Sequence, residues 1–220
     1  MTLWILIRSS IFPAARNRLQ NPVSSEVGGL IHPLGTILEL ADRMNFCSSC
    51  GSAVSRRVPE GDNRERAICD DCGTVHYQNP LVVVGCVVES EGKILLCTRS
   101  IEPRYGYWTV PAGFMELGET LAGGAARETL EEACATVDIS HQFATVDVVD
   151  AGQVHVFFCG KLVGKFGVGE ESLDARLFSE DEIPWDDLAF ESGRFALQKY
   201  LEDRGANNGV HFHELRRSKS

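Results

Sequence analysis

Two Cys-x-x-Cys pairs place the tightest limit on how this chain of 220 residues can fold. The first pair is Cys47 and Cys50, and the second, after a gap of 18 residues, is Cys69 and Cys72. Each pair forms a tight turn that points both sulfurs at one ion, so four thiolates at this spacing can close a tetrahedral zinc site. The alternative is two redox dithiols or disulfides. We favour zinc, because a glycine directly after each pair lets the backbone fold back as a knuckle.

The four-thiolate set leaves no ligand position open for water, which indicates a structural zinc rather than a catalytic one. The unit at residues 44–78 is too small to bury much apolar surface, so metal binding should supply much of its folding energy. His76 follows closely, but the set of four is already complete, and we interpret this histidine as an ordinary polar residue.

The remaining four cysteines are Cys86, Cys97, Cys134 and Cys159. They are scattered along the chain, and three of them lie in apolar stretches. This distribution is not a secreted disulfide framework and indicates a reducing compartment. We therefore expect a cytoplasmic protein, with organellar targeting by residues 1–43 as the minor alternative, because that stretch contains arginine but no acidic residue until Glu26.

The net charge of −10 bears on the partners. It lies almost entirely beyond residue 43, and an acidic body is a poor match for a nucleic-acid backbone, which needs clustered lysine and arginine. It suits a protein that reaches phosphates through divalent cations. No apolar stretch approaches the roughly 20 residues that cross a bilayer. We expect a small nucleotide diphosphate substrate, no nucleic acid and no membrane, and leave a homodimer open.

Four parts follow one another along the chain. Residues 1–43 form a leader, interpreted as a disordered or non-native extension, with Met44 as an alternative start. The zinc ribbon at 44–78 is followed by a main domain at 79–205 and a polar tail at 206–220. Within the main domain, the patterns predict strands at 81–88, 93–98, 144–149, 154–162 and 173–178, and helices at 120–135 and 192–203. This mixture of strands and helices predicts an α/β or α+β architecture.

Three glutamates share one face of the first predicted helix. Glu128 and Glu132 are four residues apart, Glu131 lies beside them, and Arg127 is the only nearby cation. Carboxylates so close repel each other unless they bind hard cations, and their oxygens suit Mg²⁺ or Mn²⁺. Taken alone, such a cluster is more often a solvated acidic helix face than a metal site.

The spacing of the residues around these glutamates decides between a metal site and a solvated helix face. The pattern Gly-x5-Glu-x7-Arg-Glu-x-x-Glu-Glu over residues 113–135 resembles the signature of the Nudix hydrolase family, and the preceding run Trp108–Gly113 resembles its entry. Three positions depart from the family: Thr129, Cys134 and Ala135. Glycine is usual where Cys134 stands, and a cysteine with positive φ there costs on the order of 1 kcal/mol, unless the helix ends differently.

The resemblance implies a Nudix-type α/β/α sandwich with a mixed sheet. It also implies attack of a metal-activated water on a diphosphate phosphorus. The implied site consists of Glu128 and Glu132 as main metal ligands, Glu131 as an additional one, the carbonyl of Ala112 as a backbone ligand, and Arg127 with Glu119 as the pair that orients them. The general base is a glutamate of this set or of a later loop, where Glu170 and Glu171 are candidates.

A zinc ribbon before such a domain resembles two groups, the NADH pyrophosphatases and enzymes similar to FAD and ADP-ribose pyrophosphatases. The first group has a Ser-Gln-Pro-Trp-Pro-Phe-Pro run after the signature, which residues 148–154 lack. We therefore favour FAD or ADP-ribose, with Tyr105 and Trp108 as candidates to stack on a ring. The alternatives are an NADH pyrophosphatase and a non-catalytic nucleotide-sensing module.

Overall fold

A computed structural model describes residues 44–216, so the predicted leader at 1–43 and the last four residues of the predicted tail lie outside it. The first part of the described chain is a three-stranded antiparallel sheet of β1 (Val54–Arg57), β2 (Arg66–Cys69) and β3 (Val75–His76). Within residues 44–78 the only buried residues are Cys47, Ala67, Ile68 and Cys69. Half of this small core therefore consists of cysteines, as expected for a unit that depends on a metal.

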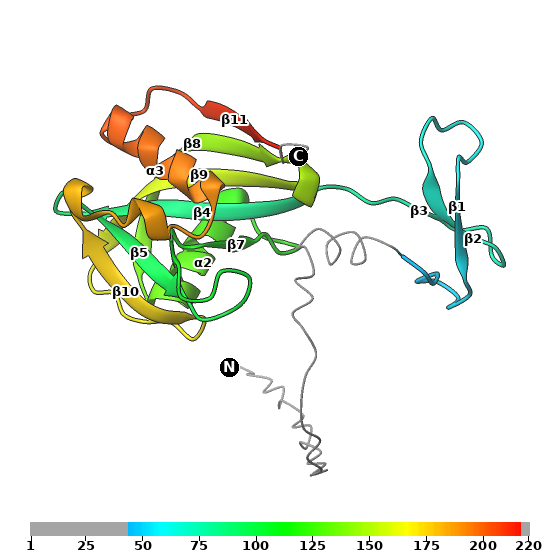
Figure 1. The fold of residues 1–220 in the computed structure, drawn as a ribbon, viewed down its shortest axis with the longest axis horizontal. Coiled ribbons are helices and arrows are strands. Elements are labelled where there is room, and N and C mark those ends of the chain that lie inside the picture. Colours follow the sequence, from blue (N-terminus) through cyan, green and yellow to red (C-terminus); the bar gives the residue numbers. More distant parts are fainter. Residues whose placement is uncertain (1–43, 217–220) are drawn as a thin grey trace, which may run out of the picture. The chain divides into compact units, whose positions relative to one another are not determined.

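The second part is built on an eight-stranded sheet (Figure 1). Its main path runs β10-β5-β4-β9-β8-β11. These strands are β4 (Leu81–Ser90), β5 (Lys93–Arg99), β8 (Thr136–Val148), β9 (Gln153–Val163), β10 (Ser172–Phe178) and β11 (His211–Leu215). β4 pairs with β9 and β11 with β8 in parallel, whereas β8 with β9 and β10 with β5 are antiparallel. The predicted mixed sheet is thus confirmed.

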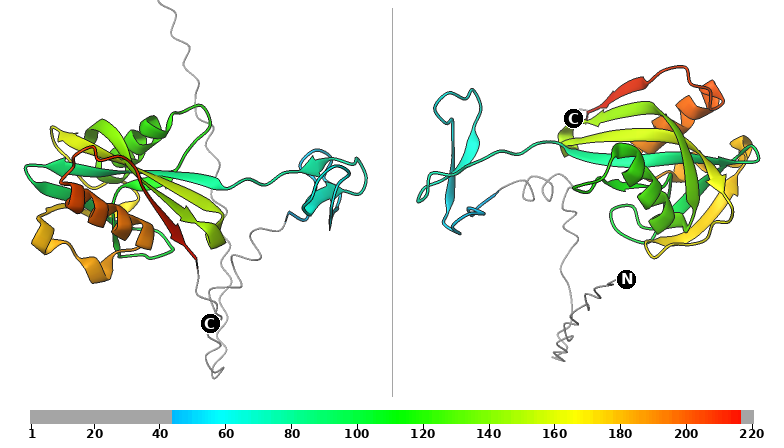
Figure 2. Two further views of the ribbon diagram at one scale, coloured as in Figure 1. Left: turned by 90° about the horizontal axis from the view of Figure 1, so that it is seen from above. Right: turned by 180° about the vertical axis from the view of Figure 1, so that it is seen from behind.

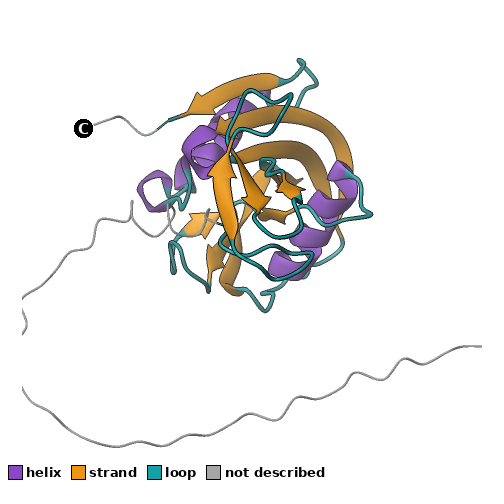
Figure 3. Cartoon of the chain, turned by 90° about the vertical axis from the view of Figure 1, so that its right-hand side faces the viewer, coloured by secondary structure: helices purple, strands orange, loops and turns teal. Residues whose placement is uncertain are grey.

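Two helices cover opposite faces of this sheet (Figures 2 and 3). They are α2 (Leu121–Ala133) and α3 (Glu191–Asp203). Alternation along β4 divides the core, because Val84 packs with Ala125 of α2 and Val87 packs with Leu197 of α3. The predicted α/β/α sandwich is therefore confirmed. Single-turn 3₁₀ helices lie at Val149–Ala151, Glu180–Glu182 and Trp185–Asp187.

The hairpin of β4 and β5 opens after its first residue pairs, and this opening makes room for the segment that precedes α2. β5 pairs with β4 only near Glu89 and Ser90, and β7 (Ala112–Phe114) takes the place beside residues 83–85. Gly85 permits this approach, because a Cβ there would lie 2.7 Å from the Cβ of Ala112. β6 (Trp108–Thr109) pairs with β5. The segment before α2 is thereby held against the sheet.

Two predicted boundaries are wrong. β8 begins at Thr136, eight residues before the predicted strand, because its first half carries polar side chains and two irregularities of register that hide the alternation. The predicted polar tail contains β11, which pairs with β8 although three of its five residues are exposed. Within the described residues, no helix is both long and apolar enough to cross a membrane.

Candidate functional site

Thr120 sets the start of α2 and so the direction in which its glutamates point. Its hydroxyl accepts a hydrogen bond from the amide of Gly123 at 3.0 Å, which satisfies one of the free donors of the first turn. From this start, Glu128 and Glu132 face the sheet and are buried, whereas Glu131 is exposed. The helix therefore presents two buried carboxylates and one accessible carboxylate along one side.

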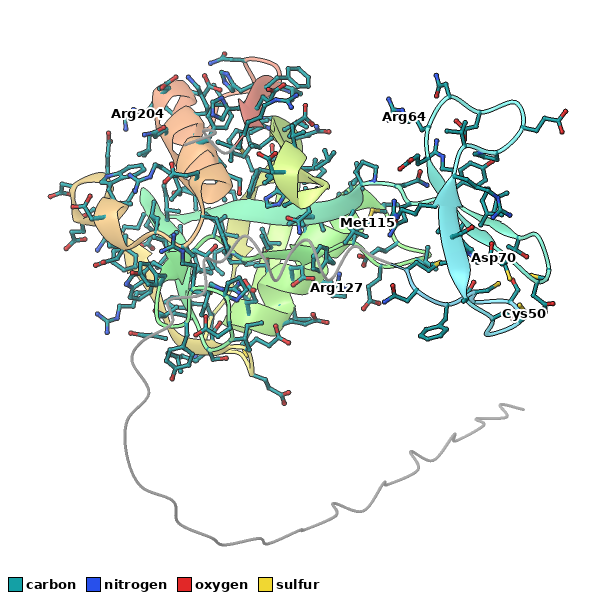
Figure 4. All side chains as sticks on the ribbon, turned by 45° about the vertical axis from the view of Figure 1, so that its right-hand side comes forward. Cys50, Arg64, Asp70, Met115, Arg127 and Arg204 are labelled. Carbon is teal, nitrogen blue, oxygen red and sulfur yellow. The ribbon has the colours of Figure 1, made fainter. Side chains whose placement is uncertain are left out.

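Arg127, labelled in Figure 4, connects the carboxylates to the loop before the helix. Its Nε and Nη2 atoms donate to the two oxygens of Glu119 at 3.0 and 2.9 Å, and Nη2 also donates to the carbonyl of Phe114. Its Nη1 atom donates to Glu128 at 2.8 Å and to Glu131 at 2.9 Å. One guanidinium thus fixes three carboxylates and the loop at once.

Glu119 is the ionised anchor of this arrangement. Hydrogen bonds from Arg127, followed by one from the amide of Glu116 at 2.7 Å, lower the pKa of Glu119 to about 2. Gly124 makes the approach possible, because a Cβ there would lie 2.6 Å from the Glu119 carboxylate. Loop and helix are therefore held together by a permanently charged pair.

The two buried glutamates lie against the backbone of β7. Glu132 accepts a hydrogen bond from the amide of Ala112 at 3.1 Å, and the Glu128 carboxylate occupies the space beside Gly113, where a Cβ would come within 2.4 Å. Burial, then the charges of Glu128 and Glu171, raise the pKa of Glu132 to about 8, despite the opposing amide. Burial also raises the pKa of Glu128.

This donor set fits a divalent cation. Buried carboxylates that resist ionisation gain most from a bound cation, and their oxygens suit Mg²⁺ or Mn²⁺. The structure brings together the predicted residues Glu128, Glu131, Glu132, Arg127 and Glu119. Ala112 lies at the same place, where its amide contacts Glu132. Its predicted role as a carbonyl ligand stays a prediction.

Cys134 shows how the unusual end of the signature is accommodated. It has a φ of 48° and a ψ of 31°, so the helix ends in the left-handed conformation that a glycine would favour. Its thiol contacts the carbonyl of Val168 at 3.5 Å. The helix does not end differently, and the structure absorbs the conformational cost.

Arg99 is a site residue that the sequence analysis misses. Its charge opposes the rise in the pKa of Glu132, and its guanidinium lies 5.0 Å from the ring centre of Phe190. Its Nε atom donates to the carbonyl of Pro103 at 2.9 Å. Arg99 is in none of the ion pairs formed within the described part of the chain. The only available signal was its place directly after the predicted strand 93–98.

The two aromatic candidates differ in accessibility. Trp108 packs edge-on against Phe178, with ring centres 4.8 Å apart, and its carbonyl accepts from the amide of Ala189. This ring is used in packing, which disfavours the predicted stacking on a substrate. Tyr105 is 54% exposed and stays a candidate.

The four predicted zinc ligands converge, and their sulfur atoms gather beside Cys50 in Figure 4. Three of the Sγ–Sγ distances are 3.7 Å for Cys47–Cys72, 3.4 Å for Cys50–Cys69 and 3.5 Å for Cys50–Cys72. Zinc–sulfur bonds of about 2.3 Å put the corners of a tetrahedron roughly 3.8 Å apart, so the set fits zinc. His76 is more than an ordinary polar residue, because its Nε2 atom lies 3.3 Å from the sulfur of Cys47.

Comparisons with known proteins agree with this geometry. A model of the zinc-ribbon Nudix N-terminal region matches residues 45–78, and a model of the NUDIX domain matches residues 79–198. The crystal structure of a NUDIX hydrolase from Nitrosomonas europaea is similar, with 49% sequence identity and a TM-score of 0.76 over 79% of this chain and 100% of that one.

Several curated relatives carry functional names. An ADP-ribose pyrophosphatase of Methanocaldococcus jannaschii is 30% identical over 120 residues, which is 52% of this chain and 70% of the relative. A NAD-capped RNA hydrolase NudC of Vibrio atlanticus is 36% identical over 104 residues, which is 46% of this chain. The chain spans only 35% of that relative and 54% of the corresponding protein of Vibrio vulnificus.

Proposed function

The chain belongs to the Nudix hydrolase family, and on that premise we propose that it hydrolyses the diphosphate bond of a nucleotide linked to a second group. The observation that carries the proposal is the pair of buried carboxylates, Glu128 and Glu132, held against the backbone of Gly113 and Ala112. Burying two acids costs free energy, and groups with a perturbed pKa cluster at functional sites. Binding divalent cations at a diphosphate is such a use.

Each residue of the site has a task in this proposal. Glu128, Glu132 and the more exposed Glu131 hold divalent ions, which when bound neutralise charge on the diphosphate and make water a better nucleophile. Arg127 and Glu119 keep the three carboxylates in place. A loop glutamate, Glu170 or Glu171, accepts the proton of the attacking water. Ala112 offers its backbone beside the ligands.

Arg99 adds a task that the signature does not contain. Its guanidinium is held by the Pro103 carbonyl and the Phe190 ring, and its charge already acts on Glu132. Because Arg99 is in none of the ion pairs formed within the described part of the chain, it is free to contact the distal phosphate of a substrate. Tyr105 on the adjoining loop is the candidate to stack on a base.

The substrate we propose is FAD or ADP-ribose. The resemblance to the relative named ADP-ribose pyrophosphatase supports it, as does the absence of the NADH-type run from residues 148–154. FAD would give FMN and AMP. A second candidate, an NADH-type or NAD-capped substrate, is favoured by the relatives named NudC. The expectation that nucleic acid is not a partner stays a prediction.

The test is a parallel measurement of turnover on FAD, ADP-ribose, NADH and NAD-capped RNA with saturating Mg²⁺ or Mn²⁺. We expect turnover of FAD or ADP-ribose to be fastest, and we expect Glu132→Gln to abolish it. Fastest turnover of capped RNA would overturn the substrate choice. If the wild type turns over none of the four compounds faster than Glu132→Gln does, the chain is a nucleotide-sensing module instead.

The ribbon at residues 44–78 has a separate part in the proposal. We assign it one structural zinc held by its four cysteines, because the sulfur distances fit a closed tetrahedral site. His76 donates to the Cys47 sulfur and so helps to hold this ligand in place. The hydrolytic site lies in the main domain, beginning at residue 79.

A further inference from the structure

Segment 167–172 lies across the end of α2 and connects it to β5. The amide of Gly167 donates to the carbonyl of Ala133 at 2.7 Å, and that of Gly169 donates to the carbonyl of Glu132 at 3.0 Å. These two bonds satisfy acceptors that the last turn of a helix leaves free. At its other end, the carbonyl of Glu171 accepts from the amide of Ser100 at 3.0 Å.

The contact at Gly169 is closer than any side chain allows. A Cβ at this position would lie 1.8 Å from the carbonyl oxygen of Glu131 and 2.7 Å from the carbonyl carbon of Glu132. Its backbone is not left-handed, so close approach and not conformation is the reason for glycine here. By contrast, a Cβ at Gly167 would meet only the Cβ of Cys134, at an ordinary 3.6 Å.

Gly169 also begins the turn that carries both loop glutamates. The amide of Ser172 donates to the carbonyl of Gly169 at 3.2 Å, which closes a four-residue turn with Glu170 and Glu171 at its centre. The position of this turn is therefore set by the contact of Gly169 with the backbone of Glu131 and Glu132.

We infer that Gly169 is a positioning residue: because it lacks a side chain, the turn can lie against the last turn of α2 and hold the carboxylate of Glu171 beside those of Glu128 and Glu132. The carbonyl of Glu171 is fixed by the amide of Ser100 at 3.0 Å, so of the two loop glutamates the backbone geometry favours Glu171. The inference rests on the proposed function, and it selects Glu171 over Glu170 as the group that takes the proton from water.

The test compares two alanine substitutions in one segment of the full, zinc-loaded chain. With saturating Mg²⁺ and ADP-ribose, Glu171→Gln should lower kcat by roughly 100-fold, as expected for loss of a general base. Gly169→Ala should lower kcat by about 10-fold with KM little changed, because the carboxylate is displaced. Gly167→Ala, whose Cβ fits, should stay within about 2-fold of the wild type.

A double variant separates positioning from general damage. If Gly169 acts through Glu171, adding Gly169→Ala to Glu171→Gln should change kcat by less than about 2-fold. Full additivity of the two losses would overturn the inference, as would wild-type kcat in Gly169→Ala or a larger loss in Glu170→Gln than in Glu171→Gln. Turnover by the wild type that Glu132→Gln removes would leave the proposed function standing in each of these cases.

If Gly169→Ala gives no cooperative melting transition, the variant Val168→Gly tests the inference in its place. This side chain is 50% exposed, and the change loosens the segment without a steric clash. We expect a fall in kcat of at least about 3-fold that is absent in the Glu171→Gln background. An unchanged kcat would overturn the inference.

Discussion

The ribbon and the main domain both gather like-charged metal ligands, but they hold them in opposite ways. In the ribbon, two short turns bring four sulfurs within 4.8 Å of one another, with almost no core around them. In the main domain, the glutamates lie on a helix that packs on a large sheet, and Arg127 joins three acidic side chains through its guanidinium. We therefore expect the first site to need its ion to fold, and the second to be built before any ion arrives.

The difference teaches where the free energy of each site comes from. The ribbon buries too little apolar surface to offset the repulsion of four thiolates, so we expect a bound metal ion to stabilise it. The main domain has two apolar cores, on either side of its sheet, and can tolerate the cost of the buried acids Glu128 and Glu132. Removing ligands should therefore unfold the first site and inactivate the second.

The largest effect is expected in the ribbon. Cys47→Ser or Cys69→Ser should release about one zinc per chain and leave residues 45–78 without protection, because the remaining thiolates cannot close the site. Zinc analysis together with hydrogen exchange of the ribbon amides measures both consequences. The main domain should keep its own melting transition. An intact, reduced protein that contains no zinc would refute the structural role.

The glutamates provide the opposite result. Glu128→Gln and Glu132→Gln keep side-chain volume but each removes a charge, so the divalent ion binds less well and kcat should fall by at least roughly 100-fold. Melting without Mg²⁺ should stay at the wild-type temperature or rise, because glutamine avoids the free energy that burial of an ionisable carboxyl group costs. A Glu132→Gln enzyme that melts normally and turns over near the wild-type rate would sink the mechanism.

Arg127 should show an effect between those of the cysteine and the glutamate variants, because it both stabilises the fold and positions the carboxylates. Arg127→Ala should lower the free energy of unfolding by about 2–4 kcal/mol, since three carboxylates lose their partner. The catalytic loss should be smaller than for Glu132→Gln, roughly 10-fold, because the ligands are misplaced but present. Arg204→Ala, which removes an exposed pair with Glu180, is the matched control and should leave melting nearly unchanged. Equal melting of the two variants would contradict the role of Arg127.

Fixed spacing explains what the sequence revealed. The cysteine pairs and the glutamate signature depend on short-range geometry, turns and helical repeats, and the structure brings both sets together. The mixed sheet and its two covering helices agree with the resemblance that these motifs carry. Arg99 belongs to no such spacing, because its charge acts on Glu132 from the far end of β5, where this strand no longer pairs with β4.

Polar strands explain what the sequence concealed. β11 and the first half of β8 lie at the edge of the sheet, where one face or both meet solvent, so apolar alternation is weak. Their pairing is decided by the neighbouring strand rather than by their own composition. The contact of Gly169 with α2 is likewise invisible in the sequence, because it joins residues 37 positions apart.

The most gradual expected effect is a pH dependence that the ribbon should not share. The pKa of Glu132 is raised to about 8 in the folded chain, compared with about 4.3 for an unfolded glutamate. A raised pKa means that the folded chain binds the proton of Glu132 more tightly than the unfolded chain does. The contribution of this proton to the free energy of unfolding is complete below about pH 4 and is lost as pH rises through 8. Between these limits the free energy of unfolding of the metal-free wild type should fall by up to about 1.4 kcal/mol per pH unit relative to Glu132→Gln.

Melting of both proteins from pH 5 to 8.5 in Mg²⁺-free buffer, without a chelator that would strip zinc, measures this difference. Saturating Mg²⁺ should reverse it at pH 8, because the ion needs the ionised carboxylate. Parallel melting curves for the two proteins across this range would show that Glu132 is not held as a buried acid.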